Sequence, residues 1–119
     1  MYNNVKVKIK IVKYYKTIYS DPLILNPGDE VIPGEEEKEE KWSGWILCEF
    51  NGKKGWVPKQ IIKSKEDNSG IITEYYSAKE LDVSEGEILN YINELNGWLL
   101  LENSKGETGW VPKENTEPA

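Results

Sequence analysis

Hydrophobic and polar residues alternate strictly near the start of the chain. The apolar set is Val5, Val7, Ile9 and Ile11, and the polar set between them is Lys6, Lys8 and Lys10. A period of two is typical of a half-buried β-strand, so we predict a strand over residues 5–13 with a lysine-bearing outer face. We interpret these lysines as a solvated face or as protection of a strand edge, with an anionic docking stripe as the alternative.

The next thirty residues carry turn formers and charges in place of a regular apolar pattern. Residues 14–26 predict a long, partly extended loop in which Leu23 and Leu25 alternate with other residues, and residues 27–29 predict a turn. Val31 is expected to begin a short strand that ends at Pro33-Gly34. Residues 35–41 hold five Glu and two Lys without an apolar residue, which predicts an exposed loop.

Residues 45–57 give the clearest local signal, that of a β-hairpin. Residues 45–50 are apolar enough for a strand, Asn51-Gly52 is a pair that tolerates positive φ, and residues 55–57 return antiparallel. Pro58 has no N–H to donate, so the ladder is expected to end there. A short turn at residues 60–62 and a polar linker at residues 68–70 should follow.

The second half of the chain repeats the first. Gly55-Trp56-Val57-Pro58-Lys59 recurs 54 positions later as Gly109-Trp110-Val111-Pro112-Lys113, and Gly44-Trp45 recurs 53 positions later as Gly97-Trp98. A period near 50 indicates one structural unit per copy. The repeat predicts strands at 71–72, 86–91, 98–102 and 108–111, a loop at 93–96, and a short closing strand near 115–116. We therefore predict an all-β fold of two small barrels, with domains at 1–65 and 66–119.

The residue types present restrict the chemistry that the chain can perform. The 119 residues include neither His nor Arg, so the commonest general base and metal ligand is missing. Cys48 is the single cysteine, which excludes an internal disulfide, and we expect it to be a buried small hydrophobe. No phosphate-binding glycine loop or nucleophile motif occurs. We predict a non-catalytic protein without a cofactor or a metal site.

Charge is distributed unevenly between the two halves. Residues 1–66 hold 12 Lys and 10 acidic residues, whereas residues 67–119 hold 3 Lys and 11 acidic residues. Nucleic-acid binding depends on cations at phosphates, so we do not expect a nucleic acid as partner. Residues 1–6 have no apolar region of a signal peptide, and no stretch reaches the length of a membrane span. We expect a cytoplasmic protein with no membrane partner.

The order of landmarks along the chain resembles the SH3 domain taken twice. These landmarks are a double tyrosine, an acid-Leu-x-apolar loop exit, a Gly-acid turn, a Gly-Trp strand, a hairpin and Gly-Trp-Val-Pro. The resemblance covers residues 5–63 and 70–117 and is greatest to the divergent tandem "variant SH3" proteins of bacteria. It implies a five-stranded, partly open barrel in each half. It implies core positions at Ile9, Ile11, Leu23, Leu25, Val31, Ile46, Cys48, Val57 and Ile62, and then at Ile72, Leu81, Val83, Leu89, Leu99, Leu101 and Val111. Polar Thr116 falls where Ile62 sits, so we expect the second barrel to be the less stable.

The resemblance also implies a groove for proline-rich peptides, lined by aromatic rings and a proline. The candidates are Tyr15, Trp45 and Pro58 in the first repeat, and Tyr76, Trp98 and Pro112 in the second. Glu80 is the candidate acidic anchor for a cationic ligand residue, while Pro22 takes that place in the first repeat. Other groove tyrosines of the family are replaced here by Lys13, Glu74, Ile61 and Asn115.

These features favour an adaptor-type protein-interaction module that binds a peptide or a folded protein. In an alternative interpretation, Trp45 and Trp98 pack between the two barrels or against local loops. We interpret Trp42, Trp56 and Trp110 as structural or partly exposed strand residues. A second hypothesis is a cell-wall or glycan-binding module. A third is a rigid structural unit in which the basic first half contacts the acidic second half within the same chain.

Overall fold

The computed structural model describes residues 7–119, and every regular element in that part is a β-strand or a short 3₁₀ turn. The strands are β1 (Lys8–Ile11), β2 (Ile24–Leu25), β3 (Glu30–Glu36), β4 (Trp45–Phe50), β5 (Lys53–Pro58), β6 (Ile62–Ser64), β7 (Gly70–Ile72), β8 (Tyr76–Ser77), β9 (Ile88–Leu95), β10 (Trp98–Glu102), β11 (Thr108–Pro112) and β12 (Thr116–Pro118). The 3₁₀ turns are η1 (Glu40–Trp42), η2 (Lys59–Ile61) and η3 (Lys113–Asn115). The predicted all-β fold is confirmed.

The chain forms two compact units, and one is inserted in the other. Unit 1 consists of Glu80–Ala119 together with the N-terminal segment up to Tyr19, and unit 2 is Ser20–Lys79. The chain therefore passes between the units twice, first after Tyr19 and again after Lys79. This division differs from the predicted domains 1–65 and 66–119, which would be joined by a single linker. The reason for the difference lies in the partners of the first strand of each repeat.

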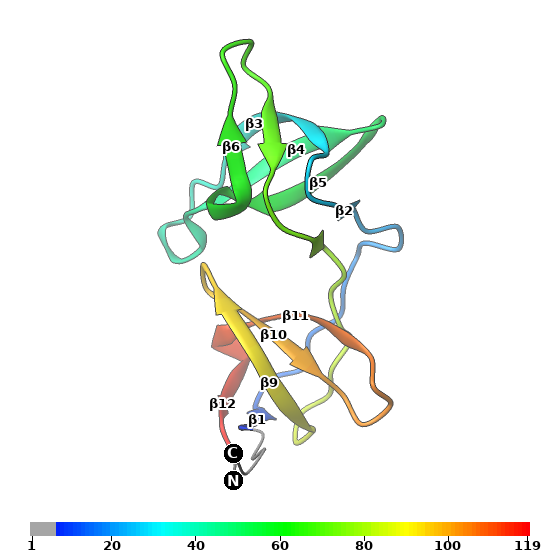
Figure 1. Ribbon diagram of the computed structural model, residues 1–119. Helices are drawn as coiled ribbons and strands as arrows, with labels where there is room; N and C mark the ends of the chain where they lie inside the picture. Colours follow the sequence, from blue (N-terminus) through cyan, green and yellow to red (C-terminus); the bar gives the residue numbers. More distant parts are fainter. Residues whose placement is uncertain (1–6) are drawn as a thin grey trace, which may run out of the picture. The chain divides into compact units, whose positions relative to one another are not determined.

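In unit 1, the N-terminal strand of the chain completes a sheet built from the second repeat. The strand order is β11-β10-β9-β1-β12, and β1 lies between β9 and β12 (Figure 1). Ile9 is opposite Leu89 on β9 and Pro118 on β12. The backbone N–H of Ile11 donates to Glu87 O at 2.9 Å. The first strand of the first repeat thus belongs structurally to the second repeat.

Unit 2 shows the reciprocal exchange. Its sheet has the order β5-β4-β3-β7-β6, in which β7 comes from the second repeat and the other four strands come from the first. Val31 on β3 is opposite Gly70, and Ile62 on β6 is opposite Ile72. Because β2 pairs with β8, the two ends of Ser20–Lys79 meet within unit 2. Unit 2 thus contains a complete set of strands in a circularly permuted order.

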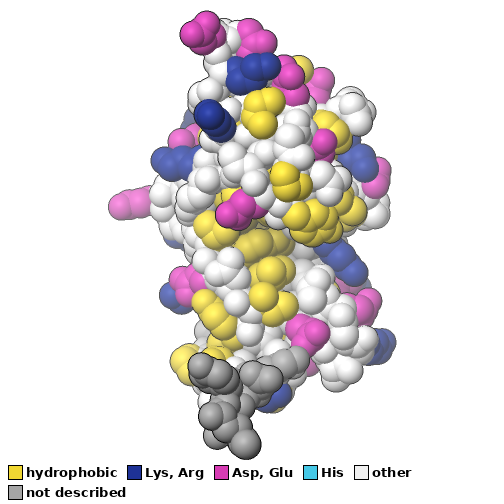
Figure 2. Space-filling view, in the orientation of Figure 1, with side chains coloured by type: hydrophobic (Ala, Val, Ile, Leu, Met, Phe, Trp, Pro, Cys, Tyr) yellow, Lys and Arg dark blue, Asp and Glu magenta, His cyan; other side chains and the backbone are white. Residues whose placement is uncertain are grey.

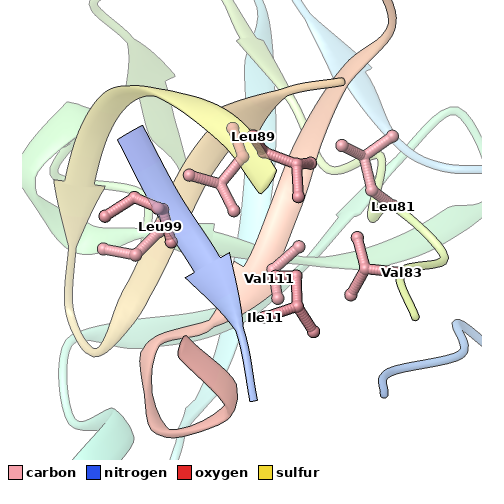
Figure 3. Packing of buried hydrophobic residues seen from close by; sticks show 8 residues of the cluster. Ile11, Leu81, Val83, Leu89, Leu99 and Val111 are labelled. Carbon is pink, nitrogen blue, oxygen red and sulfur yellow. The ribbon is translucent and has the colours of Figure 1, made fainter. Parts of the chain in front are cut away.

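The core of unit 1 draws on both parts of the chain. Its buried members are Ile9, Ile11, Leu81, Val83, Leu89, Leu99, Leu101 and Val111. Figure 3 shows Ile11 of β1 beside Val111 of β11, with Leu81 and Val83 from the segment that re-enters unit 1. All eight residues were predicted to be core, but Ile9 and Ile11 were assigned to the barrel of the first repeat.

The buried residues of unit 2 follow the prediction with two shifts. The buried apolar side chains are Leu23, Leu25, Val31, Trp45, Cys48, Val57, Pro58, Ile61, Ile72 and Tyr76. Ile46 and Ile62, which were predicted to be core, are only half-buried. On β4 the inward positions are Trp45 and Cys48, and the 3₁₀ turn η2 directs Ile61 inward in place of Ile62. Trp110 in unit 1 is buried as well, in agreement with a structural role.

Several strand ends differ from the sequence-based expectation. Strand β3 continues through Pro33-Gly34 to Glu36, because the register shift between Pro33 and Glu36 accommodates residues that do not fit a regular ladder. Strand β9 runs on to Leu95, so the turn is Asn96-Gly97, where both residues have positive φ. Val7 is 59% exposed and does not join the core. The predicted strand residues 5 and 6 lie outside the described residues.

The predicted hairpin of residues 45–58 is confirmed with its turn. Strands β4 and β5 pair from Trp45↔Pro58 to Phe50↔Lys53. Asn51 and Gly52 between them have φ of 51° and 79°, the left-handed conformation that an Asn-Gly pair adopts at low cost. Gly55 on β5 has a separate reason to be glycine, because an added Cβ would lie 2.9 Å from the Leu23 Cβ. This close approach holds β2 and the loop before it against β5.

A buried asparagine fastens the N-terminal segment to unit 1. Asn115 is 6% exposed and takes the place of Ile61 in the repeat, so the polar replacement in the core lies here and not at half-buried Thr116. Its Nδ2 donates to the carbonyl oxygens of Lys13 at 3.3 Å and Tyr14 at 3.1 Å. The backbone carbonyl oxygen of Asn115 accepts a hydrogen bond from the backbone N–H of Val12 at 2.9 Å. That the second barrel is the less stable stays a prediction.

We expect Asn115→Ala to destabilise unit 1 by about 1–3 kcal/mol, because two carbonyl acceptors lose their buried donor. Denaturant unfolding, followed by the amide signals of unit 1, measures the change. Asn93→Ala is the control, since Asn93 is exposed on β9; it should cost no more than about 0.5 kcal/mol. Equal effects of the two substitutions would contradict a fastening role for Asn115.

Candidate functional site

Each candidate tryptophan is paired across its hairpin with the candidate proline of the same repeat. Trp98 at the start of β10 is opposite Pro112 at the end of β11, and Trp45 on β4 is opposite Pro58 on β5. The hairpin register sets these pairs, because each proline lacks an N–H and stands at the end of its strand. The two Trp-Pro pairs therefore arise from pairing within one hairpin of each repeat.

The two candidate tyrosines are exchanged between the repeats. Tyr15 lies against Trp98, with ring centroids 5.7 Å apart and an interplanar angle of 86°, an edge-to-face contact. Tyr76 lies against Trp45, at 6.4 Å and 46°. The predicted groupings of Tyr15 with Trp45 and of Tyr76 with Trp98 are therefore wrong for this structure. The cause is the strand exchange, since each tyrosine follows the first strand of its repeat into the other unit.

Glu80 joins the ring pair of unit 1. The Tyr15 hydroxyl donates to Glu80 Oε1 at 2.7 Å. The backbone of Glu80 forms a parallel bridge with Trp110 on β11, two residues before Pro112. Tyr15, Glu80, Trp98 and Pro112 thus belong to one assembly, although Tyr15 and Glu80 are 65 positions apart in the sequence.

Two antiparallel segments of the backbone hold this assembly in place. Tyr15 and Val83 exchange both backbone hydrogen bonds, at 3.0 and 2.9 Å. Two residues further on, the backbone N–H of Thr17 donates to Asp82 Oδ1 at 2.9 Å. The outgoing and returning segments of unit 1 are therefore tied to each other directly beside Glu80.

Burial dominates the electrostatics of the Tyr15–Glu80 pair. It raises the pKa of the Glu80 carboxyl above its usual range; hydrogen bonds from the Tyr15 and Thr17 hydroxyls act in the opposite direction, and the Asp82 charge raises it further. Burial also raises the pKa of the Tyr15 hydroxyl, with Glu80 adding to the effect. The Tyr15 hydroxyl therefore remains a hydrogen-bond donor throughout the neutral pH range.

Unit 2 lacks the equivalent carboxylate. The Tyr76 hydroxyl donates instead to the backbone carbonyl of Trp56 at 2.8 Å. Pro22 stands where unit 1 has Glu80, and the neighbouring Asp21 forms an ion pair with Lys53 at 2.9 Å. Trp45 and Tyr76 are only 6% and 7% exposed, so they offer little ring surface to a ligand. The two aromatic sites are therefore chemically different.

Sequence reasoning missed two residues of the unit 1 site. Thr17 and Asp82 lie beside Glu80 but belong to the two segments of unit 1 that precede and follow the inserted unit in the sequence, so no local pattern joins them. The alternation Glu80-Leu81-Asp82-Val83 contained a partial signal, because it places both carboxylates on the side opposite the buried Leu81 and Val83. Thr17 lies beside these carboxylates only because the N-terminal segment of the chain belongs to unit 1.

The remaining chemistry of the chain is sparse. Among the described residues, no three His, Cys, Asp or Glu side chains are grouped so that they could hold a metal ion. Cys48 is buried as predicted, and burial raises the pKa of its thiol to about 11, which keeps it in the unreactive thiol form. Lysine and acidic side chains are interspersed over the face that Figure 2 shows. No helix in residues 7–119 has the length and apolar character that crossing a membrane requires.

Comparison with known proteins identifies a family for one segment of the chain. A search of curated proteins finds no match. Residues 6–64 match the family model described as variant SH3 domain. The matched residues are consecutive in sequence, but the structure divides them between the units after Tyr19. SH3-type domains are in general non-catalytic modules that bind peptides or proteins. The chain thus carries an SH3-like domain, which indicates a protein-interaction module in general.

Proposed function

We propose that unit 1 carries the ligand-binding groove of an adaptor-type protein-interaction module. The observation that supports this most is the assembly of Tyr15, Trp98 and Pro112 with the carboxylate of Glu80. Tyr15 and Trp98 are half-buried rings that leave surface on which an extended proline-rich peptide can pack, whereas Pro112 beside Trp98 is itself buried. The nearby carboxylates of Glu80 and Asp82 suit a peptide that also carries a lysine or an arginine.

Unit 2 serves a structural role in this proposal. Its rings are buried, its tyrosine hydroxyl is bonded to a backbone carbonyl, and proline replaces the acidic anchor. The chain would then bind one peptide per molecule, despite its internal repeat. Binding by a single groove with few anchors should be weak, because a small number of well-packed residues carries most of the affinity.

A titration with a pooled set of proline-rich peptides tests the proposal on the full chain. We expect proton–nitrogen NMR spectra to show a shift of the Trp98 indole signal, while the Trp45 indole signal changes little. Trp98→Ala should weaken binding about tenfold or more, because a groove tryptophan supplies a large part of the contact surface. Isothermal titration calorimetry measures the loss.

Trp42→Ala is the matched control for that substitution. Trp42 is also a half-buried tryptophan, but it lies in η1 of unit 2, where Lys41 Nζ is 4.6 Å from the centroid of its ring. The substitution Trp42→Ala should leave peptide affinity unchanged. A silent Trp98 indole at millimolar peptide would contradict the proposed groove. A shift of Trp45 in place of Trp98 would assign binding to unit 2.

A further inference from the structure

The carboxylate of Glu80 is a half-buried acid within the proposed groove. The side-chain donors to it in the free protein are neutral, namely the hydroxyls of Tyr15, at 2.7 Å, and Thr17. Its charged neighbour on the same segment is Asp82, which is negative. From β11, Trp110 meets Glu80 through the backbone. In residues 7–119, no lysine forms an ion pair with Glu80.

In the free protein, burial and the Asp82 charge oppose the ionisation of Glu80, two neutral hydroxyl donors favour it, and the balance leaves its pKa raised. Burial disfavours the charged form, and Asp82 adds a like charge to the same site. The Tyr15 and Thr17 hydroxyls offset these effects only in part, because they donate hydrogen bonds but carry no positive charge. A cationic ligand side chain would supply the counter-charge that the free site lacks.

We propose that binding of a cationic peptide in unit 1 is linked to the loss of a proton from Glu80, so that acid weakens the interaction. This inference rests on the function proposed above. The ammonium or guanidinium group of the ligand accompanies the carboxylate form of Glu80, and the proton passes to the buffer. The O–H bond of the Glu80 carboxyl breaks, its electron pair stays on the carboxylate, and no other covalent bond of the protein or peptide changes.

The sign of the effect follows from linkage. A cationic ligand lowers the pKa of the acid that it binds, so the complex holds fewer protons than the free protein in the pH interval between the two values. Affinity is then constant above the pKa of free Glu80 and falls below it. The limiting slope is tenfold in dissociation constant per pH unit, because one proton is exchanged per peptide bound.

The experiment uses the full chain and a proline-rich peptide with a single arginine, and it measures affinity by calorimetry from pH 7 down to acidic pH. Two buffers with different ionisation enthalpies report the protons released at each pH. We expect proton release that rises toward the pKa of Glu80 and a matching loss of affinity. The carbon-13 signal of the Glu80 carboxyl, followed without and with peptide, should titrate at lower pH in the complex.

Two variants make the result specific to this residue. Glu80→Gln keeps an acceptor for the Tyr15 hydroxyl but cannot ionise, so it should bind more weakly and lose the pH dependence. Glu85→Gln removes the same charge from an exposed position of unit 1 and should behave as the wild type. Binding by the wild type without proton release, or the same pH profile in Glu80→Gln, would overturn the inference and leave the proposed groove standing. Absence of any peptide binding would overturn both.

Discussion

Residues 20–79 on their own are expected to fold into a stable barrel, whereas residues 1–65 and 66–119, the two halves of the sequence repeat, are not. Every strand of the sheet β5-β4-β3-β7-β6 lies within Ser20–Lys79, as do both strands of the β2–β8 pair. A cut after residue 65 removes β7 from between β3 and β6 and takes buried Ile72 and Tyr76 with it. Residues 66–119 likewise lose β1 from between β9 and β12.

The expected stability of the 20–79 fragment is modest, on the order of 3–5 kcal/mol, because a barrel of this size has a small core. Circular dichroism with denaturant unfolding should show one cooperative transition for this fragment. The fragments 1–65 and 66–119 should show none under the same conditions. A cooperative transition in 1–65, together with an unfolded 20–79 fragment, would show that the repeats close consecutively and would contradict the nested arrangement.

Ile11→Ala and Ile72→Ala form the second test, because they make the same deletion at equivalent positions of the two repeats. Both side chains are fully buried, and Ile11 belongs to the core of unit 1, whereas Ile72 lies in unit 2. Each substitution should cost about 2–5 kcal/mol through lost burial and a cavity. The unit that loses stability distinguishes the two arrangements of the chain.

Hydrogen exchange of individual amides supplies that distinction. Ile11→Ala should reduce protection in β10 and β11, near Leu101 and Val111, and leave β4 and β5 near Val57 protected. Ile72→Ala should do the opposite. Each variant serves as the control for the other, since size, chemistry and burial match. Loss of protection at Val57 in Ile11→Ala would place the N-terminal strand in the barrel of its own repeat.

Charge is consistent with the exchanged pairing. Residues 1–19 contain five lysines and no acidic residue, while residues 80–119 contain two lysines and nine acidic residues. Joining these segments in unit 1 brings the most basic part of the chain to the most acidic part. Most of these charges are exposed, so salt should screen their attraction and the contribution is small. Packing and hydrogen bonds, among them those of Asn115, contribute the greater part.

The candidate site shows how far reasoning from the sequence could reach. The seven candidate residues were carried over from the family resemblance, and their role in binding stays a prediction; the Trp-Pro pairs join residues of one hairpin. The aromatic partner of each tyrosine could not be predicted from the sequence, because it depends on which unit the first strand of each repeat joins. Thr17 and Asp82 were missed for the same reason, since they are 65 positions apart in the sequence and meet only when the two segments of unit 1 pair.

The sequence by itself determined the local structure of this protein. Alternation and turn residues were sufficient for most strands and for the Asn51-Gly52 hairpin, because these depend on neighbours a few residues away. The core positions came from the family resemblance. Where a local rule has exceptions, as with the strand that continues through Pro33-Gly34, the boundaries shifted.

Only the tertiary structure decided how the repeats close. Ile11 and Ile72 are the same residue type at equivalent positions of the two repeats, and so are Tyr15 and Tyr76. The first strand of each repeat therefore has the residue pattern that fits the sheet of either unit. Such a pattern is degenerate, and the choice rests on contacts between segments more than sixty positions apart, such as Tyr15 with Glu80. The physical reason is that a repeat specifies each strand twice, whereas strand pairing is settled by the long-range contacts that distinguish the copies.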